Sequence, residues 1–119
     1  MPTLLIADDH PLFREALRGV VSRMMPDAVL HEANDADGLY AMVDAQPDAD
    51  LLLLDLNIPG AQGFSVLVHL RAQHPQLPIV MVSAREESTV MRRALDHGAM
   101  GFIPKSSDAD TLVSALRHV

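Results

Sequence analysis

The chain alternates five times between a short apolar segment and a longer segment in which apolar residues recur at helical spacing. The apolar segments are residues 3–8, 28–33, 50–56, 77–83 and 100–103. The third contains four consecutive leucines, and a run that is apolar on both faces is typical of a central parallel strand covered by helices. Strict alternation of strands and helices predicts right-handed crossovers with helices on both faces of one sheet. The sequence therefore predicts an α/β fold with five parallel strands and five helices.

The predicted helices carry boundary signals. In the first helix, the apolar positions at helical spacing are Leu12, Phe13, Ala16, Leu17, Val20, Val21 and Met24. Asn34, with Asp37 three residues later, predicts the N-terminal cap of the second helix. Gly98 predicts a left-handed end of the fourth helix. Ser107 with Asp110 predicts a capping box for the last helix.

Composition limits the kinds of protein that this chain can be. Its 119 residues correspond to one domain, and 49% of them are apolar, which is enough to form a core. The formal net charge of -7 should repel the phosphate backbone of nucleic acids. There are no cysteines, which excludes disulfides and thiolate metal sites. No apolar run approaches the roughly 20 residues that cross a bilayer, so we expect a cytoplasmic protein without a membrane anchor.

Polar residues stand at or just after the ends of four predicted strands. Asp8 and Asp9 follow the first strand, Asp55 the third, Ser83 the fourth and Lys105 the fifth. In open parallel sheets the functional crevice lies at the carboxyl ends of the strands, near a switch in strand order. Taken singly, these residues also have structural explanations, as helix-initiating acids, turn formers or surface charges. Their joint placement at one rim of the sheet favours a functional site.

The residue types at this rim suit phosphoryl transfer. Three carboxylates close together repel one another by about 4 kcal/mol for a pair about 4 Å apart at an effective dielectric constant of about 20. Mg²⁺ is a natural counterion because it prefers oxygen ligands and takes one or two carboxylates plus a phosphate oxygen. Zinc fits poorly, and we treat His10 as a neighbour of the acids and not as a ligand. Lys105 and the Ser83 hydroxyl could meet phosphoryl oxygens, while an aspartate could accept the phosphoryl group.

Four segments of the sequence resemble the motif blocks of bacterial response-regulator receiver domains. They are Ile6-Ala7-Asp8-Asp9-His10-Pro11, the segment from Leu54 to Gly60 with Gly63, Val82-Ser83-Ala84, and the segment from Gly101 to Ser106. The resemblance covers the whole chain, residues 1–119. It implies a flavodoxin-like sheet with strand order 2-1-3-4-5 and five helices on both faces.

The resemblance also implies roles for the acids. Asp55 would be the phosphoacceptor, taking its phosphoryl group from a sensor histidine kinase. Asp8 and Asp9 would hold Mg²⁺ together with Asp55, and Asn57 would be a further metal ligand through its backbone carbonyl. Such a domain catalyses only its own phosphorylation and dephosphorylation.

The resemblance assigns Ser83 and Lys105 to the phosphoryl oxygens and makes Ser83 and Phe102 the switch residues. Two positions depart from the pattern that is common in the family. Ser106 follows Lys105 where a proline is common, often after a cis bond, so the isomer of this bond stays open. Phe102 stands where a tyrosine is common. Because phenylalanine has no hydroxyl, its ring cannot form a phenolic hydrogen bond when the domain changes conformation.

The residues of the first and last motifs are most similar to those of the NarL/LuxR-type subfamily. In that subfamily the receiver precedes a LuxR-type helix-turn-helix domain. We therefore expect a C-terminal DNA-binding domain in the full-length protein, which would be the only part that contacts DNA, and a possible phosphorylation-dependent homodimer. Two alternatives stay open: a free-standing receiver, and a pseudo-receiver that acts only as a protein-interaction module. The usual mark of a pseudo-receiver, loss of an acid, the acceptor or the lysine, is absent.

Overall fold

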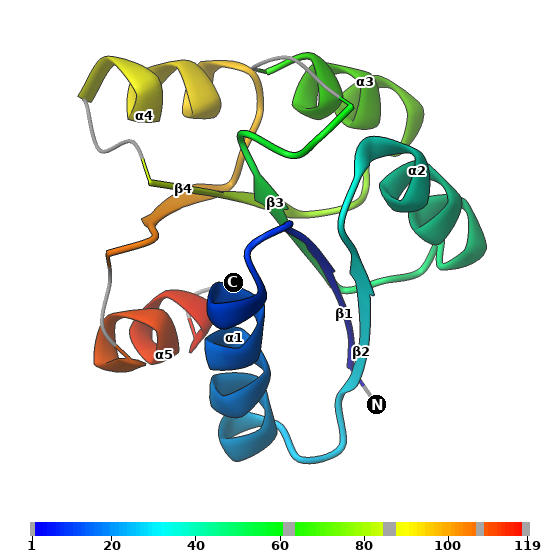
Figure 1. The fold of residues 1–119 in the computed structure, drawn as a ribbon. Coiled ribbons are helices and arrows are strands. Elements are labelled where there is room, and N and C mark those ends of the chain that lie inside the picture. Colours follow the sequence, from blue (N-terminus) through cyan, green and yellow to red (C-terminus); the bar gives the residue numbers. More distant parts are fainter. Residues whose placement is uncertain (1, 61–63, 85–87, 107–108, 118–119) are drawn as a thin grey trace.

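The computed structural model describes residues 2–60, 64–84, 88–106 and 109–117, and strands alternate with helices throughout (Figure 1). The elements are β1 (Thr3–Ala7), α1 (Pro11–Met24), β2 (Val29–Ala33), α2 (Ala36–Ala45), β3 (Leu51–Asp55), α3 (Ser65–Gln73), β4 (Ile79–Ser83), α4 (Ser88–Asp96), β5 (Gly101–Pro104) and α5 (Ala109–Arg117). The strands pair in parallel in the order β2-β1-β3-β4-β5. The predicted flavodoxin-like α/β fold is confirmed, and β1 to β4 are each one or two residues shorter than predicted.

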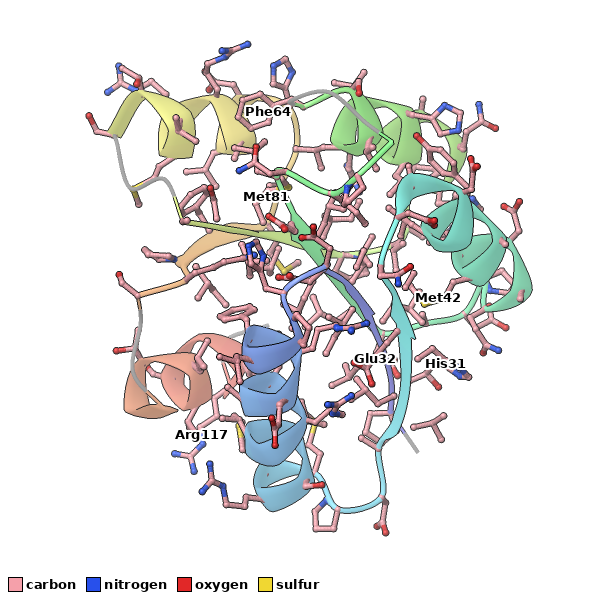
Figure 2. The ribbon with its side chains drawn as sticks, in the orientation of Figure 1. His31, Glu32, Met42, Phe64, Met81 and Arg117 are labelled. Atoms are coloured by element: carbon pink, nitrogen blue, oxygen red, sulfur yellow. The ribbon has the colours of Figure 1, made fainter. Side chains whose placement is uncertain are left out.

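The sheet has an aliphatic core on each face. Helices α2, α3 and α4 cover one face and α1 and α5 the other (Figure 1). Every residue of β3 and β4 is buried, as the run of leucines in β3 requires. On the first face, Met81 of β4 lies in the core and Phe64 packs against α4 through His97 and Arg93 (Figure 2). Among the described residues, no helix is both long and apolar enough to cross a membrane.

The start of α1 corrects one expectation about its buried face. Leu17, Val20 and Val21 are buried as predicted, but the Leu12 side chain is 82% exposed. An α-helix turns by about 100° per residue, so Leu12 points about 140° away from Leu17. Leu12 therefore lies outside the stripe that faces the sheet.

The cap of α2 is Asp35 and not Asn34, so that prediction is wrong. Asp35 has an extended backbone, and its Oδ1 accepts a hydrogen bond of 2.7 Å from the backbone N–H of Gly38. A capping oxygen must reach an N–H two or three residues ahead, and because α2 begins at Ala36, Asp35 occupies that position. The left-handed Gly98 is confirmed, with φ of 99°. Ser107 and the Asp110 side chain lie outside the described residues, so their capping box stays a prediction.

The cap gives a direct test of these local rules. We expect Asp35→Ala to lower the free energy of unfolding by about 1 kcal/mol, because the Gly38 N–H loses its acceptor. Asn34→Ala is the matched control and should change stability by no more than about 0.5 kcal/mol. Urea unfolding followed by circular dichroism measures both variants. Equal losses in the two variants would contradict the assignment of the cap.

Candidate functional site

Parallel pairing brings the predicted site residues to one rim of the sheet. The register pairs Ala7 with Leu54, so Asp8 and Asp55 follow on neighbouring strands. Pairing also continues just beyond the strand ends, since the N–H of Asp8 donates to the carbonyl of Ala33 at 3.0 Å. In the same way the N–H of Lys105 donates to the carbonyl of Ser83 at 2.8 Å. Backbone hydrogen bonds therefore fix the points from which these side chains extend.

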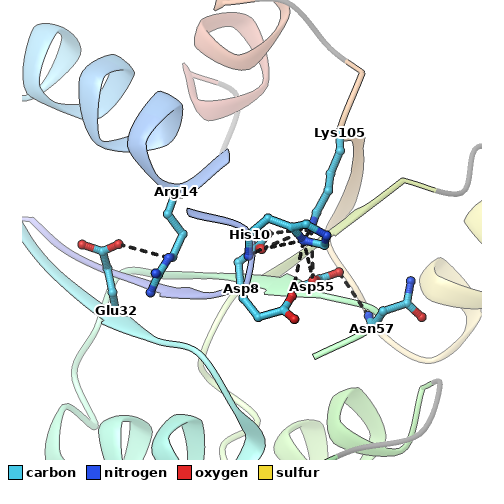
Figure 3. A network of polar contacts seen from close by, with 8 residues as sticks. Asp8, His10, Arg14, Glu32, Asp55, Asn57 and Lys105 are labelled. Atoms are coloured by element: carbon cyan, nitrogen blue, oxygen red, sulfur yellow. Dashed lines mark hydrogen bonds and ion pairs between the residues drawn. The ribbon is translucent and has the colours of Figure 1, made fainter. Parts of the chain in front are cut away.

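The acids form a compact and largely buried cluster (Figure 3). The side chains of Asp8 and Asp55 are 0% and 1% exposed, while Asp9 is more open to solvent. Ligand atoms of Asp8, Asp9, His10 and Asp55 all lie within 4.8 Å of one another. Asp8 Oδ2 is buried and accepts no hydrogen bond, although it forms an ion pair with the Lys105 ammonium at 3.0 Å. An oxygen-rich cluster with a buried carboxylate oxygen that lacks a hydrogen bond fits a divalent cation.

Lys105 is the cationic partner of this cluster. Its Nζ lies 3.0 Å from Asp8 Oδ2 and 3.1 Å from Asp55 Oδ2, and the side chain is only 11% exposed. The ammonium also lies over the Phe13 ring, 5.3 Å from its centroid. The peptide bond to Ser106 is trans. The charged partners of Lys105 are thus two buried carboxylates.

His10 belongs to the cluster, which the sequence analysis left outside the site. Its Nδ1 lies 3.2 Å from Asp8 Oδ1 and 3.3 Å from Asp9 Oδ1, and it is hydrogen-bonded to Lys105 Nζ. The signal in the sequence was its position directly after the acid pair, at the N-terminal cap of α1. That position turns the side chain back over the ends of the strands.

The remaining predicted residues surround Asp55. The backbone N–H of Asn57 donates to Asp55 Oδ1 at 3.1 Å, and the Asn57 side chain is exposed (Figure 3). Ser83 is fully buried at the end of β4, next to the strand that carries Asp55. Phe102 is half-buried and packs against the core beneath α2, α3 and α4. The structure therefore brings the predicted acids and Lys105 together, places Ser83 at the end of the strand next to Asp55, and packs Phe102 against the core.

A comparison of the sequence with known protein families points to the same kind of domain as the parallel five-stranded sheet and its acid cluster. The family model of the response regulator receiver domain matches residues 4–117, almost the whole chain. The chain belongs to this family and is a receiver domain of a two-component response regulator.

Its relatives are regulators of the NarL/LuxR type. The chain is 41% identical over 119 residues to the glycerol metabolism activator of Pseudomonas putida, covering 100% of this chain and 54% of the relative. It is 35% identical over 117 residues to the nitrate/nitrite response regulator protein NarL of Escherichia coli strain K12, covering 98% and 53%. The chain thus spans about half the length of the curated relatives it matches.

Solved structures agree with this assignment. The signal receiver domain of the response regulator NarL from Mycobacterium tuberculosis superposes with a TM-score of 0.85 at 30% identity, covering 98% of this chain and 94% of that chain. A LuxR-family two-component response regulator from Aurantimonas has a TM-score of 0.86, also at 30% identity, with coverages of 98% and 82%.

The charge of the pocket should limit its stability. Without divalent cations, we expect Asp8→Asn to raise the free energy of unfolding by about 1 kcal/mol, because it removes one of several buried like charges while Lys105 keeps Asp55 as a partner. Chemical unfolding in the presence of a chelator measures this change. Asp48→Asn, at an exposed acid in the loop between α2 and β3, is the matched control and should change little. A loss of stability in Asp8→Asn would mean that the Lys105 ion pair outweighs the repulsion.

Proposed function

We propose that Asp55 accepts a phosphoryl group from a phosphohistidine of a sensor histidine kinase. The observation that carries this proposal is the environment of the buried Asp55 carboxylate. Its Oδ1 accepts the N–H of Asn57, and its Oδ2 lies 3.1 Å from Lys105 Nζ. A carboxylate that is held in position beside a lysine is a competent phosphoryl acceptor.

In the transfer step, a carboxylate oxygen of Asp55 forms a bond to phosphorus as the bond between phosphorus and the histidine nitrogen breaks. The histidine nitrogen keeps the electron pair of that bond. The Lys105 ammonium and the Ser83 hydroxyl then bind oxygens of the phosphoryl group. Such transfers depend mainly on positioning and on neutralising charge. Dephosphorylation is a separate step: water attacks phosphorus, the bond between phosphorus and the Asp55 oxygen breaks, and phosphate leaves while the carboxylate is restored. The domain would thus catalyse only its own phosphorylation and dephosphorylation.

The same residues fit a Mg²⁺ ion. Asp8, Asp9 and Asp55 would hold it, with the backbone carbonyl of Asn57 as a further ligand, and the buried Asp8 oxygen without a hydrogen bond supports this assignment. When bound, Mg²⁺ supplies positive charge against the carboxylates and the phosphoryl oxygens.

The phosphoryl group would change the conformation of the domain through Ser83 and Phe102. Ser83 ends β4 and Lys105 directly follows β5, and both lie just beyond the register position at which Phe102 pairs with Met81. Binding of both residues to one phosphoryl group favours the conformation in which they approach it, and Phe102 would move with them. This is a shift between two populations, driven by the differential contacts of the phosphoryl group.

The output of the full-length protein would be transcription through a LuxR-type helix-turn-helix domain after Val119, in the cytoplasm. The names of the relatives and their roughly double length support this view. The net charge of -7 makes the receiver itself unsuited to DNA. Phosphorylation would relieve a contact between receiver and effector or promote a homodimer. A stop codon directly after Val119 would instead indicate a free-standing receiver.

Phosphorylation of Asp55 can be tested on the chain directly. Incubation with acetyl phosphate and Mg²⁺ should add one phosphoryl group, seen by intact mass, that hydroxylamine removes. Asp55→Asn should abolish the addition because an amide is a far weaker nucleophile. The control Asp48→Asn, which changes an exposed acid, should take up the phosphoryl group to the same extent as the unsubstituted chain.

Two further measurements separate the receiver from a pseudo-receiver. Excess chelator, and the variant Asp9→Ala in Mg²⁺, should each reduce phosphorylation by about 100-fold or more, since charge neutralisation supplies much of the catalysis. A phosphoryl group on Ser, Thr or His would show that Asp55 is the wrong acceptor. A chain that folds but never takes up the group would be an interaction module.

A further inference from the structure

One nitrogen atom lies among the oxygens of the acid cluster. His10 Nδ1 is 3.2 Å from Asp8 Oδ1, 3.3 Å from Asp9 Oδ1 and 3.7 Å from Asp55 Oδ2 (Figure 3). The imidazole is 58% exposed, so its free edge faces solvent while Nδ1 faces the pocket. Within the described part of the chain, the side-chain atoms available to a cation here are thus carboxylate oxygens and one imidazole nitrogen.

The hydrogen bond to Lys105 defines the role of this nitrogen. An ammonium group has three donors and no acceptor, so in the contact between Lys105 Nζ and His10 Nδ1 the nitrogen of the ring accepts. In the tautomer that accepts this bond, the Nδ1 lone pair is directed at the ammonium, and the ring donates no hydrogen bond to Asp8 Oδ1 at 3.2 Å. The same ammonium lies 3.0 Å from Asp8 Oδ2 and 3.1 Å from Asp55 Oδ2. Lys105 thus marks a point at which one nitrogen and two carboxylates converge on a cation.

The backbone holds His10 in this place. Its N–H donates to Asp8 Oδ1 at 2.7 Å, and its carbonyl accepts the N–H of Arg14 at 3.1 Å in the first turn of α1. Pro11, the first residue of α1, restricts the backbone further. The imidazole is therefore presented to the pocket by a fixed backbone and not by a free loop.

We propose that His10 is a ligand of the cation site, which makes the acid cluster a mixed nitrogen and oxygen site that favours later first-row divalent ions such as Ni²⁺ over Mg²⁺. Imidazole is a good ligand for Ni²⁺ and Zn²⁺, whereas Mg²⁺ prefers carboxylates, carbonyls and water. The buried Asp8 Oδ2 accepts no hydrogen bond and has the Lys105 ammonium 3.0 Å away, which is a further sign that the cluster suits a cation. The inference rests on the proposed function only in taking this cluster as the metal site.

The test compares two phenylalanine substitutions in the metal-free chain. His10→Phe keeps a ring but removes the nitrogen, and His69→Phe does the same at an exposed position of α3 that packs on Tyr40. Titration calorimetry with Ni²⁺ should show a loss of affinity of at least about tenfold in His10→Phe and none in His69→Phe. Affinity for Mg²⁺ should fall by no more than about twofold in His10→Phe, because a water can take the place of the nitrogen.

The outcomes separate this inference from the proposed function. If His10→Phe binds Ni²⁺ as tightly as the unsubstituted chain while Mg²⁺ still binds, His10 is no ligand and the phosphoacceptor site stands. If Asp9→Ala binds both ions with unchanged affinity, the acid cluster is not the metal site and both proposals fail. A second readout needs no variant: in the unsubstituted chain, Zn²⁺ should shift the ¹⁵N resonance of His10 Nδ1. An unshifted resonance at saturating Zn²⁺ would overturn the inference.

Discussion

Negative charge held inside a protein pocket is the constraint on which the rest of this structure depends. Asp8 and Asp55 are almost completely buried, Asp9 stands beside them, and a single ammonium lies between the two buried carboxylates. One positive charge does not balance three carboxylates, and buried like charges are costly. Such a cluster favours the binding of further positive charge, and a phosphoryl group on Asp55 would give Lys105 a new partner.

The sheet makes this arrangement possible. Asp8, Asp55 and Lys105 are distant in sequence, and they meet only because β1 lies beside β3 and the ladder continues through β4 to β5. The aliphatic cores on both faces supply the stability that the charged rim lacks. Ser83 and Phe102, the proposed switch residues, sit on β4 and β5, so a change at the rim would act on the strands beside α4 and α5.

The α/β class could be predicted from sequence because short apolar runs alternate with segments of helical apolar spacing, whereas the strand order was implied by the resemblance to receiver domains. The strand-end residues could be predicted as well, because parallel strands end at one rim. The first residue of a helix could not be predicted to within one position. Asp35 caps α2 in place of Asn34, since propensity does not fix where a helix begins. The place of His10 also depended on geometry, because only the cap of α1 turns its ring toward the acids. The ion pairs of Lys105 with two buried carboxylates were likewise invisible in a sequence that shows only strand ends.

We expect Lys105 to hold the acid cluster together in the metal-free chain and to change partners when a cation and a phosphoryl group bind. A crystal structure of the chain with Mg²⁺ and beryllium trifluoride, a phosphoryl mimic, compared with the metal-free crystal, tests it most directly. The account predicts a metal ion at Asp8, Asp9 and Asp55, the fluoride group on Asp55, and Lys105 Nζ bonded to fluorine and no longer to Asp8. Lys105 still bridging Asp8 and Asp55, with the metal ion elsewhere, would contradict it.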